Sequence, residues 1–226
     1  MQKIGIIASL PEELAALKAG MRVTGELEKA GLHFTQGAIG QKQVVATICG
    51  VGKVNGARTA QVLIDHFAPD AIIHTGVAGS LHERASHLSL VVSTELVYHD
   101  MDTAWLLQNP PFTDVFPADS TLCEALCKAA EPFGKANAGR MVTGDRFIGD
   151  KAVKQEIAAR CGGLCVDMET AATAHVALSN HVAYCAIKCI SDMADESTDG
   201  AFAEFVAIAA DKAARSTLLA IQALQK

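Results

Sequence analysis

The sequence has no excess of positive charge. It contains 19 Lys and Arg against 25 Asp and Glu, for a formal charge of -6 at pH 7, and the pI is near 5.7. Nucleic acids and anionic membranes attract basic surfaces, so neither is expected as a partner. No apolar run is long enough to span a bilayer, and the N-terminus lacks the apolar core of a signal peptide. We therefore expect a cytoplasmic protein that acts on a small molecule.

The sequence also lacks the features of a disulfide-linked or metal-binding protein. Its cysteines are odd in number, and most lie in apolar periodic segments, where a free thiol behaves as a small hydrophobic side chain. Three pairs share a C-x3-C spacing, but each pair falls on a different expected element, and no His stands at zinc-ligand spacing to them. The seven are Cys49, Cys123, Cys127, Cys161, Cys165, Cys185 and Cys189. We expect them to be reduced core residues and expect no metal site.

What the chain does have is enough apolar sequence for one core. Its 226 residues are 50% hydrophobic and 19% charged, and no internal repeat or low-complexity linker divides them. This predicts one domain over residues 1–226. Short β-rich apolar runs alternate with helical patterns, as in βα units. The expected fold class is α/β, with a central mixed, largely parallel sheet flanked by helices.

The pattern locates most of the elements. The expected strands are 4–9, 33–39, 43–48, 71–75, 88–96, 140–143, 164–166 and 182–190, with 33–39 and 43–48 forming a hairpin. The expected helices are 11–18, 52–66, 119–130, 151–159, 168–178 and 201–224. Only the segment 98–118 is irregular, and it holds the single tryptophan, Trp105. A loop of this length is typically functional or part of an interface.

Two acidic residues stand where apolar runs near the C-terminal end stop. Glu169 follows 165–168, and Asp192 follows 187–191. Burying an unpaired charge is costly, so a carboxylate in such a place is a candidate for chemistry. A helix N-cap for Asp192 and a surface charge for Glu169 explain the pattern equally well at this point.

Glycine-rich junctions follow four of the expected strands, at 8–13, 49–53, 75–80 and 143–148. Ligands of open α/β sheets bind beyond the carboxyl ends of the strands, so these junctions are where a site is expected. The spacing of Gly50, Gly52 and Gly56 resembles a dinucleotide-binding turn, and Asp70 lies about as far downstream as a ribose-binding acid. A tight turn with close helix packing is the simpler explanation of the same glycines.

Eight segments carry a wider resemblance in their order and spacing. They are Ile4-Gly5-Ile6-Ile7-Ala8 with Glu12-Glu13, Gly50-Val51-Gly52-Lys53-Val54, Thr75-Gly76-Val77-Ala78-Gly79, Tyr98-His99-Asp100, Thr143-Gly144-Asp145-Arg146-Phe147-Ile148, Val166-Asp167-Met168-Glu169, Ile190-Ser191-Asp192-Met193-Ala194-Asp195, and Phe202-Ala203-Glu204-Phe205. Together they resemble the 5'-methylthioadenosine/S-adenosylhomocysteine nucleosidases, a branch of the nucleoside phosphorylase superfamily. The resemblance covers essentially the whole chain. It implies a nucleoside phosphorylase-like fold, no cofactor, and hydrolysis of the N-glycosidic bond of an adenine thionucleoside.

The resemblance also implies a role for each acidic residue. Such hydrolysis passes through an oxocarbenium-like transition state and needs an acid, a positioned water and negative charge near the sugar. Asp192 matches the general acid that protonates adenine N7, and Glu13 matches the residue that activates water. A helix-start carboxylate explains Glu13 as well, and Glu12 would serve that purpose equally. Glu169 matches the acid that binds the ribose hydroxyls, with Met168 beside it on the sugar.

The remaining implied contacts surround the base and the subunit interface. The Phe147 ring and the Ile148 backbone are expected to hold adenine, and Ser191 to steady the acid. The other expected pocket residues are Val51, Phe202, Ala78 and Gly79. The resemblance further implies a homodimer in which the 98–118 segment reaches the partner's pocket, with Trp105 near the 5' substituent.

Three positions depart from the commoner family pattern. Many relatives carry Ser at the position of Val77 and Arg at the position of Lys188, both near the water, and Glu at the position of Asp167. Three other functions remain open: a phosphorolytic purine nucleoside phosphorylase, an NAD(P)-dependent oxidoreductase based on the Gly50 turn, and a nucleoside-binding protein without activity. A phosphorylase is disfavoured because carboxylates beside the expected phosphate would repel it.

Overall fold

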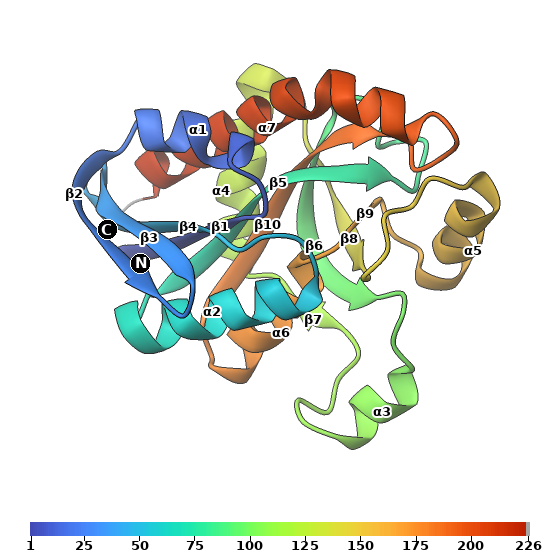
Figure 1. Ribbon diagram of the computed structural model, residues 1–226, viewed down its shortest axis with the longest axis horizontal. Coiled ribbons are helices and arrows are strands. Elements are labelled where there is room, and N and C mark those ends of the chain that lie inside the picture. Colours follow the sequence, from blue (N-terminus) through green and yellow to red (C-terminus); the bar gives the residue numbers. More distant parts are fainter. Residues whose placement is uncertain (225–226) are drawn as a thin grey trace.

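Apolar runs form the strands of a mixed sheet with helices on both faces (Figure 1). The structure is a computed structural model and describes residues 1–224. The strands are β1 (Lys3–Ala8), β2 (Arg22–Lys29), β3 (Leu32–Ile39), β4 (Lys42–Ile48), β5 (Ala71–Ser80), β6 (Leu90–Tyr98), β7 (Phe116–Pro117), β8 (Asn137–Thr143), β9 (Cys165–Asp167) and β10 (Ala183–Asp192). The helices are α1 (Glu12–Ala19), α2 (Lys53–Phe67), α3 (Thr103–Gln108), α4 (Ser120–Ala130), the short 3-10 helix η1 (Glu131–Phe133), α5 (Lys151–Cys161), α6 (Thr170–Ser179) and α7 (Thr198–Ala223).

The centre of the sheet is parallel. β4, β1, β5 and β10 are neighbours in that order and run in one direction. β3 and β2 extend this group as antiparallel strands. On the other side β10 pairs with β6, β6 with β8 and β8 with β9, and β9 returns to β5 at Gly79 and Ser80. The last pairing closes β5, β10, β6, β8 and β9 into a ring. The carboxyl ends of the parallel strands β1, β4, β5 and β10 meet at one edge of the sheet.

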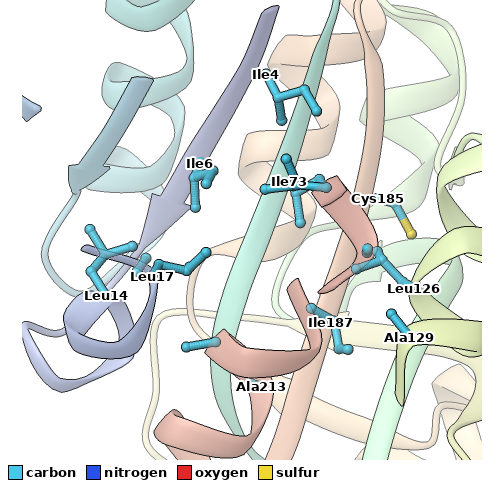
Figure 2. Close-up of a cluster of buried hydrophobic side chains, with 14 of the residues drawn as sticks. Ile4, Ile6, Leu14, Leu17, Ile73, Leu126, Ala129, Cys185, Ile187 and Ala213 are labelled. Atoms are coloured by element: carbon cyan, nitrogen blue, oxygen red, sulfur yellow. The ribbon is translucent and has the colours of Figure 1, made fainter. Parts of the chain in front are cut away.

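Alternate residues of the central strands pack against different helix layers. Ile4 and Ile6 of β1 lie in one buried cluster with residues of α1, α4 and α7, whereas Ile7 lies in a second cluster with residues of α2 and α6. Figure 2 shows the first cluster, in which Ile73 and Ile187 lie close to side chains of α4 and α7. Burial on both faces explains why these strands are largely apolar.

The structure confirms the α/β fold class and differs from the expected elements in three places. β2 was not expected, because its residues are mostly exposed and follow no apolar pattern. The 75–80 junction is not a turn: it is the second half of β5, and all ten residues of that strand are buried. The 98–118 segment is not wholly irregular, since it contains α3 and β7.

All seven cysteines are free thiols. Within residues 1–224, no group of three or more His, Cys, Asp or Glu side chains is arranged to hold a metal ion. None of the described helices is long and apolar enough to cross a membrane.

Candidate active site

A cavity of about 460 Å³ opens at the carboxyl edge of the central strands. It is lined by every residue that the sequence predicted for the site: Glu13, Val51, Ala78, Gly79, Phe147, Ile148, Met168, Glu169, Ser191, Asp192 and Phe202. Residues from seven separate segments of the chain therefore meet in one place.

Glu13 enters the cavity from the first turn of α1. The side chain is 1% exposed, and its carboxylate accepts hydrogen bonds from the backbone N–H groups of Ser9 (2.7 Å), Leu10 (2.8 Å) and Val77 (2.8 Å). A Cβ at Gly76 would overlap this carboxylate, so glycine is needed there for the close approach. Glu12 is exposed, which removes it as an equivalent of Glu13. A carboxylate has about four acceptor sites, so three bonds leave room for one more partner.

Asp192 is the last residue of β10 and lies against Gly79 of β5. It is 2% exposed, and it accepts hydrogen bonds from the Ala194 N–H (2.9 Å), the Ser191 hydroxyl (2.9 Å) and the Thr198 hydroxyl (3.4 Å). Burial raises the pKa of Asp192 above its usual value, and these donors oppose the rise. Asp192 is not a helix N-cap, since Ser197 holds that position before α7.

Glu169 stands between β9 and α6 and is 4% exposed, so the explanation as a surface charge is wrong. Its Oε1 accepts from the Gly52 N–H at 2.8 Å. Burial, followed by the nearby Asp167, raises the pKa of Glu169 to about 7, while Lys188, Gly52 and Ser9 oppose the rise. Glu169 is therefore close to its ionisation point at neutral pH.

Lys188 and Asp167 form a buried ion pair beneath these carboxylates. The Lys188 Nζ lies 3.3 Å from Asp167 Oδ2, and both side chains are almost inaccessible to solvent. Asp167 Oδ1 also accepts from the hydroxyls of Thr143 (2.6 Å) and Thr170 (2.9 Å). Burial lowers the pKa of Lys188, but the attraction of Asp167, Glu13 and Glu169 outweighs this effect and raises the pKa above its usual value. Lys188 thus supplies one fixed positive charge to a site rich in carboxylates.

The opposite end of the cavity is apolar. Phe147 packs edge-on against Phe202, with ring centroids 5.6 Å apart and an interplanar angle of 81°. Ile148 is buried beside them, whereas Phe147 and Val51 are about half-exposed. One cavity thus combines a flat apolar slot with a carboxylate-lined end.

The Gly50 turn is not arranged as a dinucleotide-binding site. The N–H groups that open α2 are occupied by the chain's own carboxylates, since Gly52 donates to Glu169 and Lys53 donates to Asp145 (2.7 Å). Asp70 lies at the other end of the sheet, where its carboxylate accepts from the N–H groups of Gln2 and Lys3. A dinucleotide would need both positions at one edge, so this interpretation is wrong.

Comparison with known proteins identifies the family. The model of the phosphorylase superfamily matches residues 3–224. A 5'-methylthioadenosine/S-adenosylhomocysteine nucleosidase from Staphylococcus carnosus is 33% identical over 98% of this chain and 100% of that protein. The chain belongs to this nucleosidase family of the phosphorylase superfamily.

Solved structures of the superfamily share the fold over nearly their whole length. The Neisseria meningitidis nucleosidase, in complex with methylthio-immucillin-A, superposes with a TM-score of 0.93 at 30% identity and covers 99% of this chain and 100% of that one. A futalosine hydrolase from Helicobacter pylori superposes with a TM-score of 0.91 at 26% identity, covering 99% and 98%. Solved structures with this fold thus include both a 5'-methylthioadenosine/S-adenosylhomocysteine nucleosidase and a futalosine hydrolase.

Sequence reasoning gave no role to six residues that line the cavity: Ser9, Leu10, Val77, Arg146, Val166 and Asp167. The last four lie inside segments that the family resemblance singled out, whereas Ser9 and Leu10 lie in the 8–13 junction between two of its parts. Position in these segments was the available signal, but it does not show which residues face the cavity.

Proposed function

We propose that this protein hydrolyses the N-glycosidic bond of 5'-methylthioadenosine and S-adenosylhomocysteine, releasing adenine and the 5-thioribose product. Membership of the nucleosidase family supports the reaction class. The placement of the carboxylates within one cavity supports the roles of individual residues.

The spacing of Glu13 and Asp192 carries this proposal. Glu13 lies against Gly76 of β5, and Asp192 lies against Gly79 of the same strand. Three residues of strand span about 10 Å. Glycosidases that place a water opposite the leaving group hold their two carboxyl groups at a similar separation, about 6.5–9.5 Å. Because both carboxylates line the same cavity, we infer that the sugar and one water bind between Glu13 and Asp192.

Asp192 acts as the general acid. It donates its proton to adenine N7, the bond between C1' and the base breaks, and water adds to C1' while Glu13 accepts the water's proton. The Ser191 hydroxyl supports both states of Asp192, because it lies 2.9 Å from that carboxylate and 3.4 Å from the Ala78 carbonyl oxygen. It donates to the ionised carboxylate, or turns toward Ala78 and accepts from the protonated one.

Glu169 binds the ribose hydroxyls, and the apolar slot holds the base. An ionised carboxylate accepts from both vicinal hydroxyls, while Met168 lies beside the sugar. Phe147 and Ile148 cover the adenine, with Val51, Phe202, Ala78 and Gly79 completing the enclosure. This arrangement needs no cofactor and no metal ion.

Water rather than phosphate accepts the ribosyl group at C1'. Glu13, Asp167 and Glu169 all lie at the sugar end of the cavity, and Arg146 is the one cationic side chain in its described lining. A phosphate dianion beside Glu13 would be repelled. The test measures adenine, free 5-methylthioribose and the sugar 1-phosphate with and without phosphate. We expect phosphate-independent release of the free sugar, and formation of the sugar 1-phosphate would refute hydrolysis.

A substrate panel tests the specificity. We expect release of the base from methylthioadenosine and S-adenosylhomocysteine, with inosine as the matched control. A futalosine-like nucleoside tests which 5' substituents the cavity accepts. Turnover of inosine but not of the thionucleosides would overturn the assignment. Binding of the thionucleosides without any release of adenine would instead indicate a nucleoside-binding protein.

The 98–118 segment supports assembly as a homodimer. It carries four exposed apolar side chains, Met101 (43%), Trp105 (64%), Leu107 (53%) and Phe112 (65%). An exposed cluster of this kind favours a protein interface, and we propose that the segment contacts the partner near its cavity.

Cytoplasmic location is the last element of the proposal. The seven free thiols suit a reducing compartment, where cysteines stay unpaired.

A further inference from the structure

A buried histidine lies behind the sugar end of the cavity and has no part in the mechanism above. His74 of β5 is 0% exposed. Its Nδ1 lies 3.3 Å from the Thr173 hydroxyl, and its Nε2 lies 3.5 Å from the Ser9 hydroxyl. Both hydroxyls also reach Glu169: Thr173 donates to its backbone oxygen at 3.2 Å, and Ser9 hydrogen-bonds to its carboxylate. His74 therefore bridges two groups that contact opposite ends of Glu169.

The ring of His74 is neutral. Burial, followed by the nearby Lys188, lowers its pKa well below the usual value. A neutral imidazole has one N–H group and one acceptor nitrogen, so it donates to one hydroxyl and accepts from the other.

The position of the ring proton decides where the Ser9 hydroxyl points. With the proton on Nε2, His74 donates to Ser9, and the Ser9 proton is free for the Glu169 carboxylate. The Thr173 hydroxyl then donates to Nδ1 instead of to the Glu169 backbone oxygen, which still accepts from the Thr173 N–H at 3.0 Å. With the proton on Nδ1, Ser9 must donate to Nε2 and turns away from Glu169. An ionised, buried carboxylate favours the first arrangement, because it needs every donor within reach.

We propose that His74 is a positioning residue for sugar recognition: its Nε2–H directs the Ser9 hydroxyl onto the Glu169 carboxylate, which fixes that carboxylate to accept from the ribose hydroxyls. The inference rests on the proposed role of Glu169. It assigns a function to His74 and Thr173, two side chains that do not line the cavity.

The test compares 5'-methylthioadenosine with its 3'-deoxy analogue, which lacks one ribose hydroxyl and leaves C1' and its neighbour unchanged. The ratio of the two kcat/KM values reports the contribution of that hydroxyl. In His74→Leu we expect this ratio to fall by about 3- to 10-fold, as for one lost hydrogen bond, mainly through KM of the ribose substrate. A merely structural role would slow both substrates equally, and an unchanged ratio would overturn the proposal.

Two amide variants separate the ring nitrogens. The amide of His74→Gln reaches the position of Nε2 and should restore most of the ratio, whereas His74→Asn reaches only the position of Nδ1 and should resemble His74→Leu. Equal behaviour of the two amides would contradict the assignment of the proton to Nε2.

Ser9→Ala removes the contact between Ser9 and His74 by changing the residue that lines the cavity. This variant tests the proposal even if the His74 variants fail to fold. It should lower the ratio as much as His74→Leu, and the double variant should lower it no further, because both remove one contact. Additive losses would show that His74 does not act through Ser9.

Glu169→Gln distinguishes failure of this inference from failure of the proposed function. If Glu169→Gln loses the preference for the ribose substrate over the 3'-deoxy analogue and the His74 and Ser9 variants keep it, only the positioning role is refuted. If Glu169→Gln itself keeps the preference, the proposed role of Glu169 and this inference both fail.

Discussion

Glu169 should weaken the fold of the ligand-free protein at alkaline pH, and its neutral isostere should reverse the effect. Burial and the proximity of Asp167 raise the pKa of this carboxyl from 4.5 to about 7, although Lys188 lies nearby. The folded state therefore holds the proton more tightly than the unfolded chain does. The stabilisation from this proton is fully present below about pH 4.5 and is lost as the pH rises through about 7.

The size of the effect follows from the rise in pKa. At about 1.4 kcal/mol per pH unit, ionising Glu169 costs the folded state at most about 3 kcal/mol. Local relaxation and the higher effective dielectric of real sites reduce this to about 1–2 kcal/mol. A protein of this length gains about 2–4 °C in Tm per kcal/mol. Glu169→Gln should therefore raise Tm by about 2–8 °C at pH 8 and by much less at pH 5.

Thermal unfolding of both proteins at pH 5 and pH 8 tests this reasoning. Protein concentration stays fixed, because assembly changes Tm by mass action. Glu12→Gln is the matched control, since Glu12 is exposed one residue before Glu13, and it should show no such pH dependence. If Glu169→Gln lowers Tm equally at both pH values, the raised pKa of Glu169 is wrong. The same variant should lose affinity for the ribose, so a gain in stability would accompany a loss of function.

The other predictions concern catalysis, assembly and the buried ion pair. Asp192→Asn should slow adenine release by about 10²–10⁴-fold in single-turnover assays; retained nucleoside binding with unchanged release would exclude Asp192 as the acid. Trp105→Ala should shift sedimentation from dimer toward monomer, whereas Ile208→Ala, at another exposed apolar side chain (54%) on α7, should not; an unchanged profile would place the interface elsewhere. Lys188→Met leaves Asp167 charged and buried, so urea unfolding should show a loss of about 3–5 kcal/mol; a neutral effect would show that the pair is dispensable.

The sequence predicted most of the fold because the central elements carry local signals. Strands such as β1 and β10 are buried and largely apolar, and the helices α2 and α4 have a clear amphipathic period. β2 escaped prediction because nothing in its own residues favours a strand: it is charged, exposed and held by its pairing with β3. An edge strand of this kind depends on its neighbour.

The sequence predicted residues that line the cavity better than it predicted the contacts of residues behind them. The resemblance located eleven of the residues that line the cavity, because they belong to recurring motifs, but it gave no role to others such as Ser9 and Leu10. The second half of β5 was misjudged as a turn because Gly76 and Gly79 suggest one, whereas these glycines make room for Glu13 and Asp192. The contacts of His74 could not be predicted at all, since Ser9, His74 and Thr173 lie far apart in sequence. The pairing of β1 with β5 and the packing of α6 against β5 bring them together.

Three carboxylates share one cavity, yet their surroundings suit them to different tasks. Glu13 has three backbone N–H donors, Asp192 has one N–H and two hydroxyls, and Glu169 has one N–H and the Ser9 hydroxyl. A hydroxyl can reverse its role when the carboxyl gains a proton, whereas an N–H cannot. Glu13 is therefore held as an acceptor for water, while Asp192 sits where it can carry and release a proton. Ser9 serves both Glu13, through its N–H, and Glu169, through its hydroxyl, whereas the donors of Asp192 come from Ser191, Ala194 and Thr198. Asp192 can therefore change its protonation without rearranging the donors of the other two carboxylates.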